Sequence, residues 1–410
     1  MSERESERNF QKILQVLRDH QSVHFEACVR CGLCGKSCHV YLSDPSVENL
    51  PVTKAQKVVG LQRKKSEEVD EKFLLSLQES VYGRCTGCGR CNLNCSIGLN
   101  IASIIRVGRT ILSALGRTPE KLLRPLKNQL EYGNQMMVSA DEMRETATWI
   151  ASDLRLESGQ ESFDIPIDKE GARILYLVNP REIKFAPLSL MAAAGVFGAA
   201  KESWTLASRF FDVTNFGFIA GDDESMKQVA EAVFSEGKRL GVREVILSEC
   251  GHGARVFKWD SGVASPLPTK SIIELLDLYI EQGRVRLDKK KNAARVTLHD
   301  PCNLVRWSGV SEAQRRVLRE ACADFKEMIP NRAQNYCCGG GGGMQLLQEC
   351  SEVRLRSAEI KANQIRSSGA KVVATPCHTC IDQLTELNKK YQLKVEISTV
   401  TELVYNALLY

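Results

Sequence analysis

Two matched runs of cysteine constrain this chain more than any other feature. "CVRCGLCGKSC" begins at residue 28 and "CTGCGRCNLNC" begins at residue 85, and both follow the spacing C-x2-C-x2-C-x3-C. A single C-x-x-C pair would fit a zinc site or a redox-active dithiol. Three closely spaced thiols with a fourth one helical turn further on, present twice, instead predict two neighbouring multi-iron centres.

The same spacing occurs in two-cluster bacterial ferredoxins, where the fourth cysteine of each run binds the other [4Fe–4S] cluster. We therefore expect two cubane clusters. The first set of ligands would be Cys28, Cys31, Cys34 and Cys95, and the second set would be Cys85, Cys88, Cys91 and Cys38. The ferredoxin run usually continues with proline, whereas His39 and Ser96 stand there in this chain, so the local turn is expected to differ.

Composition decides how the remaining cysteines are interpreted. The chain has 410 residues, 16 cysteines and a formal net charge of +5. Its start, "MSERESERNFQKI", is charged where a secretory signal would be apolar. We therefore expect a cytoplasmic protein with reduced cysteines that bind metal. The small charge and the lack of a basic face or RNA motif argue against nucleic-acid binding.

The longest apolar run, residues 185–200, bears on membrane contact. It contains a proline and is short for a membrane span. We expect a buried helix there, with a docking face for a partner as the alternative. The membrane would then be reached only through a partner subunit, which would make the chain peripheral to the inner membrane.

The fold class expected is α plus α/β. Residues 1–115 would form an α-helical ferredoxin domain, because the segments around the cysteine runs have helical composition. Residues 116–170 would form a helical linker, in which Ser139 and Glu142 suggest a capping box. Beyond it, short apolar strands alternate with helices, which predicts parallel sheets with ligand chemistry at the strands' carboxyl ends.

This α/β region divides into two pseudo-repeated halves, residues 171–290 and 291–410. "LYLVNPR" parallels "VTLHDPC", "NFGF" parallels "NYCC", and "VILSECGHG" parallels "VVATPCHTC". These alignments pair Arg181 with Cys302 and Cys250 with Cys377. The second half keeps a third set of cysteines, Cys302, Cys337, Cys338, Cys377 and Cys380. The first half is degenerate and keeps only Cys250.

The motifs "DPC", "NYCCGGGGG" and "TPCHTC" resemble the cysteine-rich CCG domain of heterodisulfide-reductase-type subunits. The helical head resembles the ferredoxin module of succinate dehydrogenase and heterodisulfide reductase. The whole layout resembles the D-type subunit of that reductase, and most closely the cysteine-rich subunit of sulfate reducers' transmembrane redox complexes. The resemblance implies that the third set holds a third [4Fe–4S] cluster, of noncubane type. A zinc site, a plain cubane and a packing role remain the alternatives.

The resemblance also implies a function. We expect an electron-transfer subunit of a multisubunit redox complex, whose third cluster reduces or oxidises a disulfide or thiol with Cys250 and His252 facing the substrate. Alternatively, Cys250 is a remnant, His252 is structural, and the chain is a non-catalytic relay between a flavin, quinone or bifurcating partner and a separate dehydrogenase or aromatic-ring reductase.

The expected partners are redox subunits that contain flavin, quinone or haem, together with a small-molecule or protein disulfide. The chain's own residues add two smaller expectations. His299 and His378 flank the third set, and hydrogen bonds from them to sulfur would tune a cluster's potential. Cys322 and Cys350 lie in helical patterns, where we expect packing roles.

Overall fold

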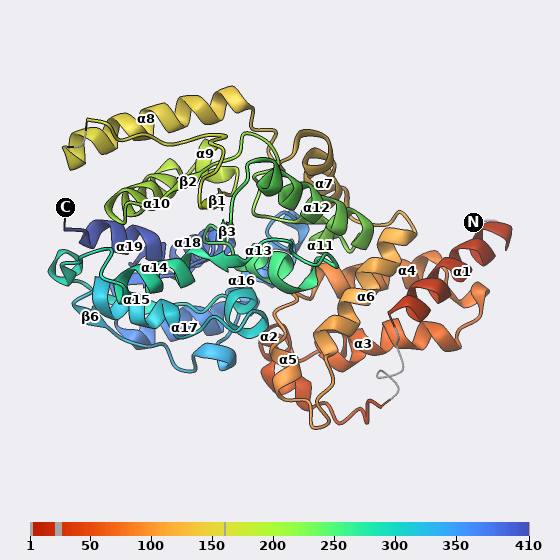
Figure 1. The fold of residues 1–410 in the computed structure, drawn as a ribbon. Coiled ribbons are helices and arrows are strands. Elements are labelled where there is room, and N and C mark those ends of the chain that lie inside the picture. Colours follow the sequence, from red (N-terminus) through yellow and green to blue (C-terminus); the bar gives the residue numbers. More distant parts are fainter. Residues whose placement is uncertain (1–2, 21–26, 160, 410) are drawn as a thin grey trace.

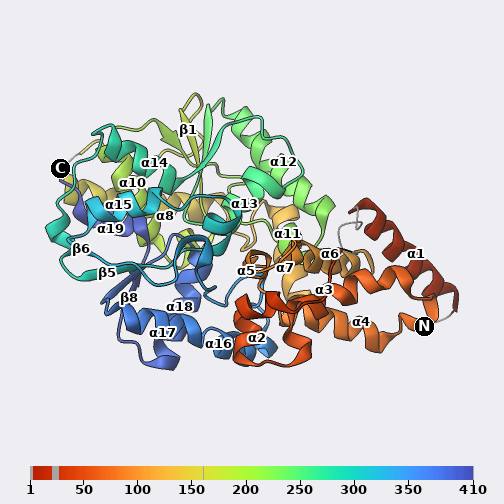
Figure 2. The ribbon, with the colours of Figure 1, turned by 90° about the horizontal axis from the view of Figure 1, so that it is seen from below.

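The computed structural model describes residues 3–20, 27–159 and 161–409, and it combines helices with short parallel strands. A helical head formed by the first part of the chain lies beside an α/β body formed by the rest (Figures 1 and 2). This mixed architecture confirms the expected helical head and parallel sheets.

The head is built from helices that bury apolar residues against one another. Helix α6 packs against α1 and α3, and its buried isoleucines and Val107 supply the centre of the head's core. The side chain of Asp70 caps α4 by accepting a hydrogen bond from the backbone N–H of Phe73 at 2.8 Å. The helices are α1 (Glu3–Asp19), α2 (His39–Ser43), α3 (Pro51–Val59), α4 (Glu71–Gln78), α5 (Arg90–Leu93) and α6 (Ile101–Ala114).

Two helices, α7 (Glu120–Tyr132) and α8 (Ala140–Ser158), connect the head to the body. The capping box expected at the start of α8 is confirmed, because Ser139 and Glu142 exchange side chain to backbone hydrogen bonds. Helix α8 then runs along the outside of α10 (Pro187–Ala199) (Figure 1).

The body contains two four-stranded sheets in which every pair of neighbouring strands is parallel. The first has the order β2-β1-β3-β4 and the second has the order β6-β5-β7-β8, so both place their strands in the same arrangement. The strands are β1 (Ile174–Leu177), β2 (Trp204–Thr205), β3 (Glu244–Leu247), β4 (Thr269–Ser271), β5 (Arg295–Leu298), β6 (Asp324–Phe325), β7 (Val372–Ala374) and β8 (Glu396–Ser398).

Helices cover both sheets and join the two halves. Helix α10 packs against α19, and α14 packs against α15, so one apolar core spans both halves. The remaining body helices are α9 (Arg181–Lys184), α11 (Phe216–Ala220), α12 (Asp223–Arg239), α13 (Gly251–Arg255), α14 (Ile272–Glu281), α15 (Ala313–Ala321), α16 (Ser351–Ser357), α17 (Glu359–Ser368), α18 (His378–Tyr391) and α19 (Val400–Ala407).

The apolar run at 185–200 forms the buried helix α10, as expected, although Phe185 and Leu188 at its start are exposed. The stretch "MQLLQECSEVRLRSAEIKANQIRSSG", which starts at Met344, has helical composition and predicts a helix, but this prediction is wrong at its beginning. The chain turns there because Gly342 and Gly343 have positive φ, and α16 begins only at Ser351.

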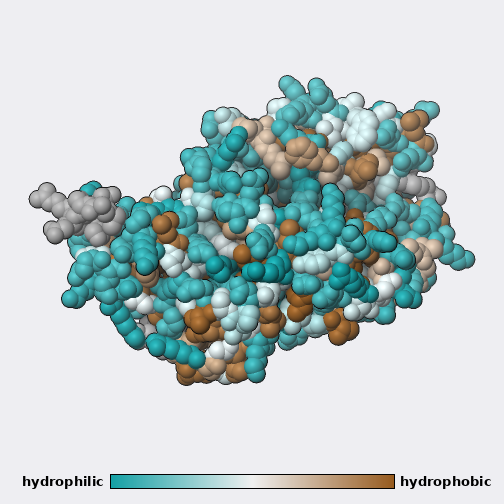
Figure 3. Space-filling model, turned by 180° about the vertical axis from the view of Figure 1, so that it is seen from behind, coloured by the Kyte–Doolittle hydropathy of each residue, from teal (hydrophilic) through white to brown (hydrophobic). Residues whose placement is uncertain are grey.

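Among the residues that the structure describes, no helix has the length and apolarity needed to cross a bilayer. The face shown in Figure 3 is mostly hydrophilic, and its apolar residues form small separate patches.

Candidate metal centres and a thiol-lined cavity

The structure brings the first set of cysteines together. Cys28, Cys31, Cys34 and Cys95 line one small cavity in the head, so the fourth cysteine of the second run does meet the first run. Cys31 is exposed, with its Sγ 3.7 Å from Ser96 Oγ, whereas Cys34 is buried. Burial, helped by the neighbouring thiols, raises the pKa of Cys34 to about 11. A thiol with a raised pKa keeps its proton near neutral pH, and a metal ion that binds the sulfur displaces that proton.

The second set is gathered deeper in the head. Cys38 lies beside Cys85 and Cys88, and Cys91 lies close to all three. Burial raises the pKa of Cys38, but the ammonium group of Lys54 opposes this shift. Lys54 is buried and donates a hydrogen bond to the carbonyl oxygen of Arg84. The positive charge of Lys54 favours the thiolate form of Cys38, and the thiolate is the form that binds metal.

The third set comes from the segments that follow the strands of the second sheet, including the first turn of α18. The Sγ atoms of Cys338 and Cys380 lie 3.4 Å apart. Cys337 lies within hydrogen-bonding reach of both Cys302 and Cys338, and Cys377 within reach of Cys380. The alignment of the two halves thus identified five residues that the fold places around one space.

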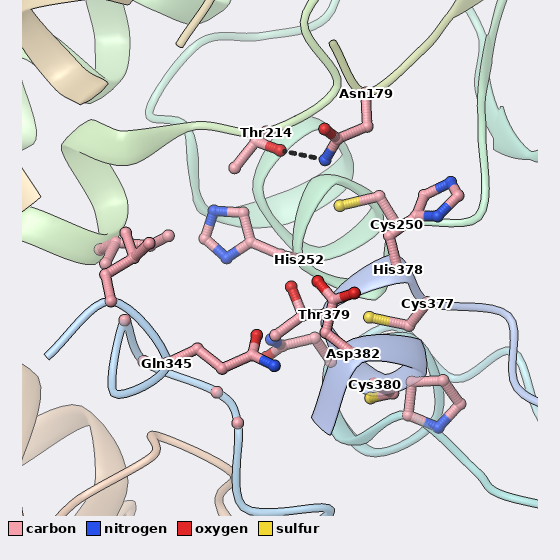
Figure 4. Close-up of a pocket in the computed structure, with 18 of the residues that line it drawn as sticks. Asn179, Thr214, Cys250, His252, Gln345, Cys377, His378, Thr379, Cys380 and Asp382 are labelled. Carbon is pink, nitrogen blue, oxygen red and sulfur yellow. Dashed lines mark hydrogen bonds between the residues drawn. The ribbon is translucent and has the colours of Figure 1, made fainter. Parts of the chain in front are cut away.

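This third set borders a cavity of about 170 Å³ (Figure 4), which we call the thiol cavity. Its lining includes Cys250 from the first half together with Cys302, Cys338, Cys377 and Cys380. Cys250 lies close enough to Cys377 for the charges of the two groups to interact. Its Sγ accepts a hydrogen bond from the backbone N–H of Gly253 at 3.3 Å. Burial raises the pKa of Cys250, so the free side chain is a neutral thiol.

His252 lines the same cavity. Its Nε2 lies 2.9 Å from the carbonyl oxygen of Asn215, which only accepts hydrogen bonds, so Nε2 carries the ring proton. Burial lowers the pKa of His252 to about 4, which keeps the ring neutral near pH 7. The structure therefore brings both predicted catalytic residues to the cavity.

The glycine run after Cys338 packs the third set against the head. A Cβ added to Gly341 would lie 3.0 Å from the carbonyl oxygen of Thr86, so a larger residue would force the two segments slightly apart. As a result, Cys337 Sγ lies 3.6 Å from Thr86 Oγ1 and within hydrogen-bonding reach of Cys88. The second and third sets therefore touch, which spacing within the sequence did not predict.

Two side chains from the body hold this junction in place. Arg306 donates hydrogen bonds to the carbonyl oxygens of Cys88 and Asn335, both at 2.6 Å. Trp307 donates from Nε1 to the carbonyl oxygen of Gly87 at 3.2 Å. Together these contacts hold the loop of the second cysteine run against the segments that carry the third set.

A buried polar chain that sequence reasoning missed lies behind the third set. Lys361 donates to Oδ1 of Asn335 at 2.6 Å, which orients the amide. The amide nitrogen then faces the carbonyl oxygen of Asp300 at 2.7 Å and Nδ1 of His299 at 3.4 Å. Because an amide N–H only donates, Nδ1 accepts and Nε2 of His299 carries the proton.

The donors fit a cluster of several metal ions. Nε2 of His299 is buried and meets no acceptor within the described protein, and a ring nitrogen of His299 lies within 4.8 Å of Cys338 and Cys380 sulfur. These three residues could hold one ion, but the other thiols of the third set surround the same space. One tetrahedral ion binds four ligands, so a multi-iron cluster uses this set more fully.

Two family profiles match the chain at these sites. A 4Fe-4S dicluster domain matches residues 24–99, and a cysteine-rich domain, CCG, matches residues 296–385. The first match covers both cysteine runs, and the second covers the whole third set.

Several known proteins are similar to nearly the full chain. The chain is 26% identical to Hdr-like menaquinol oxidoreductase iron-sulfur subunit 2 of Archaeoglobus fulgidus, over 93% of this chain and 79% of that protein. It is 26% identical to the D-type subunit of the dihydromethanophenazine:CoB--CoM heterodisulfide reductase of Methanosarcina barkeri, over 95% of both chains. It is 20% identical to EtfAB:quinone oxidoreductase of Syntrophomonas wolfei, over 93% of this chain and 58% of that protein.

These similarities support an electron-transfer role for the chain. It is similar to iron–sulfur and heterodisulfide reductase proteins, two of which are named as subunits of redox complexes.

Proposed function

We propose that the chain carries electrons through its head to the third set, where a thiol or disulfide substrate reacts in the thiol cavity. The contact between Cys88 and Cys337 is the observation that supports this proposal best, because it makes the second and third sets neighbours. A redox partner subunit, of the flavin, quinone or haem class, would exchange electrons with the first set, of which Cys31 is exposed.

The proposal assigns the ligands as the sequence predicts. The first and second sets would hold two cubane clusters, and the third set would hold a third, noncubane cluster. A noncubane cluster supplies an iron that takes a substrate sulfur as ligand and exchanges single electrons. Reduction of a disulfide consumes two electrons and two protons and gives two thiols. The chain's own part is to bind the substrate beside Cys250 and His252, which face the cavity.

The domain division follows the same scheme. We propose that residues 1–115 are the ferredoxin domain, 116–170 the linker, and 171–290 and 291–410 the two repeated halves. The equal strand order of the two sheets supports a duplication. Two relatives are named for menaquinol and quinone oxidoreductases, which supports contact with a membrane through a partner. A cytoplasmic location stays a prediction.

Electron paramagnetic resonance of the oxidised, cluster-loaded chain tests the proposed reaction. We expect a new signal that grows as a small thiol such as 2-mercaptoethanol is added, because its sulfur enters the thiol cavity. Absence of a thiol-dependent signal in a chain with all its iron would instead favour the non-catalytic relay.

Replacing His299 with phenylalanine tests the buried polar chain. We expect the midpoint potential of the third centre to fall by about 40 mV. The reason is the loss of one hydrogen bond, worth roughly 1 kcal/mol, from Nε2–H of His299 to a sulfur of the bound cluster. A redox titration followed by electron paramagnetic resonance measures this shift. The matched control is His20→Phe, which alters a histidine paired with Asp223 elsewhere in the molecule. An unchanged potential in the His299 variant would contradict the hydrogen bond.

A further inference from the structure

The thiol cavity contains a charged side that the proposed chemistry does not use. Of the described residues that line it, Arg181 is the one arginine or lysine and Asp382 is the one carboxylate. Asp382 and Thr379 project into the cavity from α18, beside Cys380 of the same helix (Figure 4). The two charged side chains form an ion pair, with Arg181 Nη1 donating to the carboxylate.

The fold explains why a cation stands there. Arg181 lies four residues after the end of β1 at Leu177, and Cys302 lies four residues after the end of β5 at Leu298. Both strands hold the second place in their sheets. The degenerate half therefore presents a guanidinium group where the intact half presents a thiol.

Arg181 has hydrogen-bonding capacity to spare. Its Nε–H is buried and has no acceptor within the described protein, although a guanidinium group offers five N–H donors in a planar fork. Its partner Asp382 has a side chain that is 39% exposed, so water can take over the carboxylate when a ligand displaces it. The imidazole of His378 is also in the lining, but its Nε2 lies 3.0 Å from Oε1 of Glu182. This nitrogen is therefore not a hydrogen-bond partner of Arg181.

The guanidinium fork matches a carboxylate. We propose that Arg181 forms an anion subsite, which selects small thiols or disulfides that carry a carboxylate a short chain away from the sulfur. This inference rests on the proposed function, because it assumes that the sulfur of the ligand enters the thiol cavity. Asp382 holds the arginine in place until the ligand carboxylate replaces it.

Three matched thiols test the subsite in the oxidised, cluster-loaded chain. 3-Mercaptopropionate, 3-mercapto-1-propanol and cysteamine differ mainly in the charge at the end opposite the sulfur. We expect the signal in electron paramagnetic resonance to reach half its maximum at a roughly tenfold lower concentration of 3-mercaptopropionate than of the neutral thiol. Propionate, which lacks sulfur, should compete with 3-mercaptopropionate.

Two variants should change this preference in opposite directions. Arg181→Gln should abolish the difference between the anionic and neutral thiols, whereas Asp382→Asn should increase it by freeing the arginine. Arg144→Gln, which alters an exposed ion pair on α8, is the matched control and should leave the preference unchanged. Iron analysis of each variant shows whether its clusters are loaded, and Arg181→Lys, which keeps the charge but loses the fork, should give an intermediate preference.

The outcomes separate this inference from the proposed function. Equal responses to the three thiols in the unaltered chain, or a carboxylate preference that survives in Arg181→Gln, would overturn the subsite and leave the proposed function standing. No response to any of the thiols would overturn both.

Discussion

Replacing Cys338 with alanine is expected to remove about four of about twelve iron atoms per chain, if the third set holds one four-iron cluster. Cys338 is buried, its Sγ lies 3.4 Å from that of Cys380, and Cys337 is within hydrogen-bonding reach. The other ligands of the third set cannot replace it at that position. The first and second sets should keep their clusters, because none of their ligands is changed.

The matched control is Cys322→Ala. Cys322 is also buried, but it packs in the apolar core at the end of α15. We expect this variant to keep the full iron content. Iron and acid-labile sulfide are measured on the chain purified without oxygen. Loss of all iron from the Cys338 variant would indicate general misfolding, and no loss would exclude Cys338 as a ligand.

Replacing Arg109 with methionine is expected to destabilise the chain by about 3–5 kcal/mol. This buried guanidinium donates hydrogen bonds to four carbonyl oxygens, those of Val81, Cys85, Ile219 and Gly342, at 2.8–3.0 Å. The acceptors belong to the head, the first half and the glycine loop of the second half. Methionine fills similar space but leaves all four acceptors buried without this donor.

Thermal unfolding followed by circular dichroism measures the loss. We expect the midpoint to fall by roughly 6–20 °C, from the shift of about 2–4 °C per kcal/mol that is typical of domains of 150–250 residues. Arg144→Met is the control, because Arg144 is exposed on α8 and pairs only at the surface with Asp141. Equal midpoints for the two variants would show that Arg109 does not join the three parts.

The sequence predicted those features that depend on local spacing. The cysteine runs identified the first and second sets. The strands that precede Cys302, Cys250 and Cys377 were recognisable from apolar runs followed closely by proline or cysteine. The edge strands β2, β4, β6 and β8 were not predicted, because two or three residues carry too little pattern. The start of α16 was placed too early, since helical composition does not reveal the turn at the glycines.

The features that were missed depend on contacts between distant segments. The approach of Cys88 to Cys337 requires the head to dock on the body, and nothing within either motif specifies it. Arg181 was paired with Cys302 by alignment, but its position in the cavity and its pairing with Asp382 emerge only from the fold. Likewise, the tautomer of His299 follows from Asn335 and Lys361, which lie far along the chain.

The central claim is that the third set holds an iron–sulfur cluster of its own, next to the two in the head. Iron content of the unaltered full-length chain, prepared and reconstituted without oxygen, tests this claim most directly. Three four-iron clusters predict about twelve iron atoms per chain, with a matching amount of acid-labile sulfide. A content of about eight iron atoms, with the third set filled by zinc or free of metal, would contradict it.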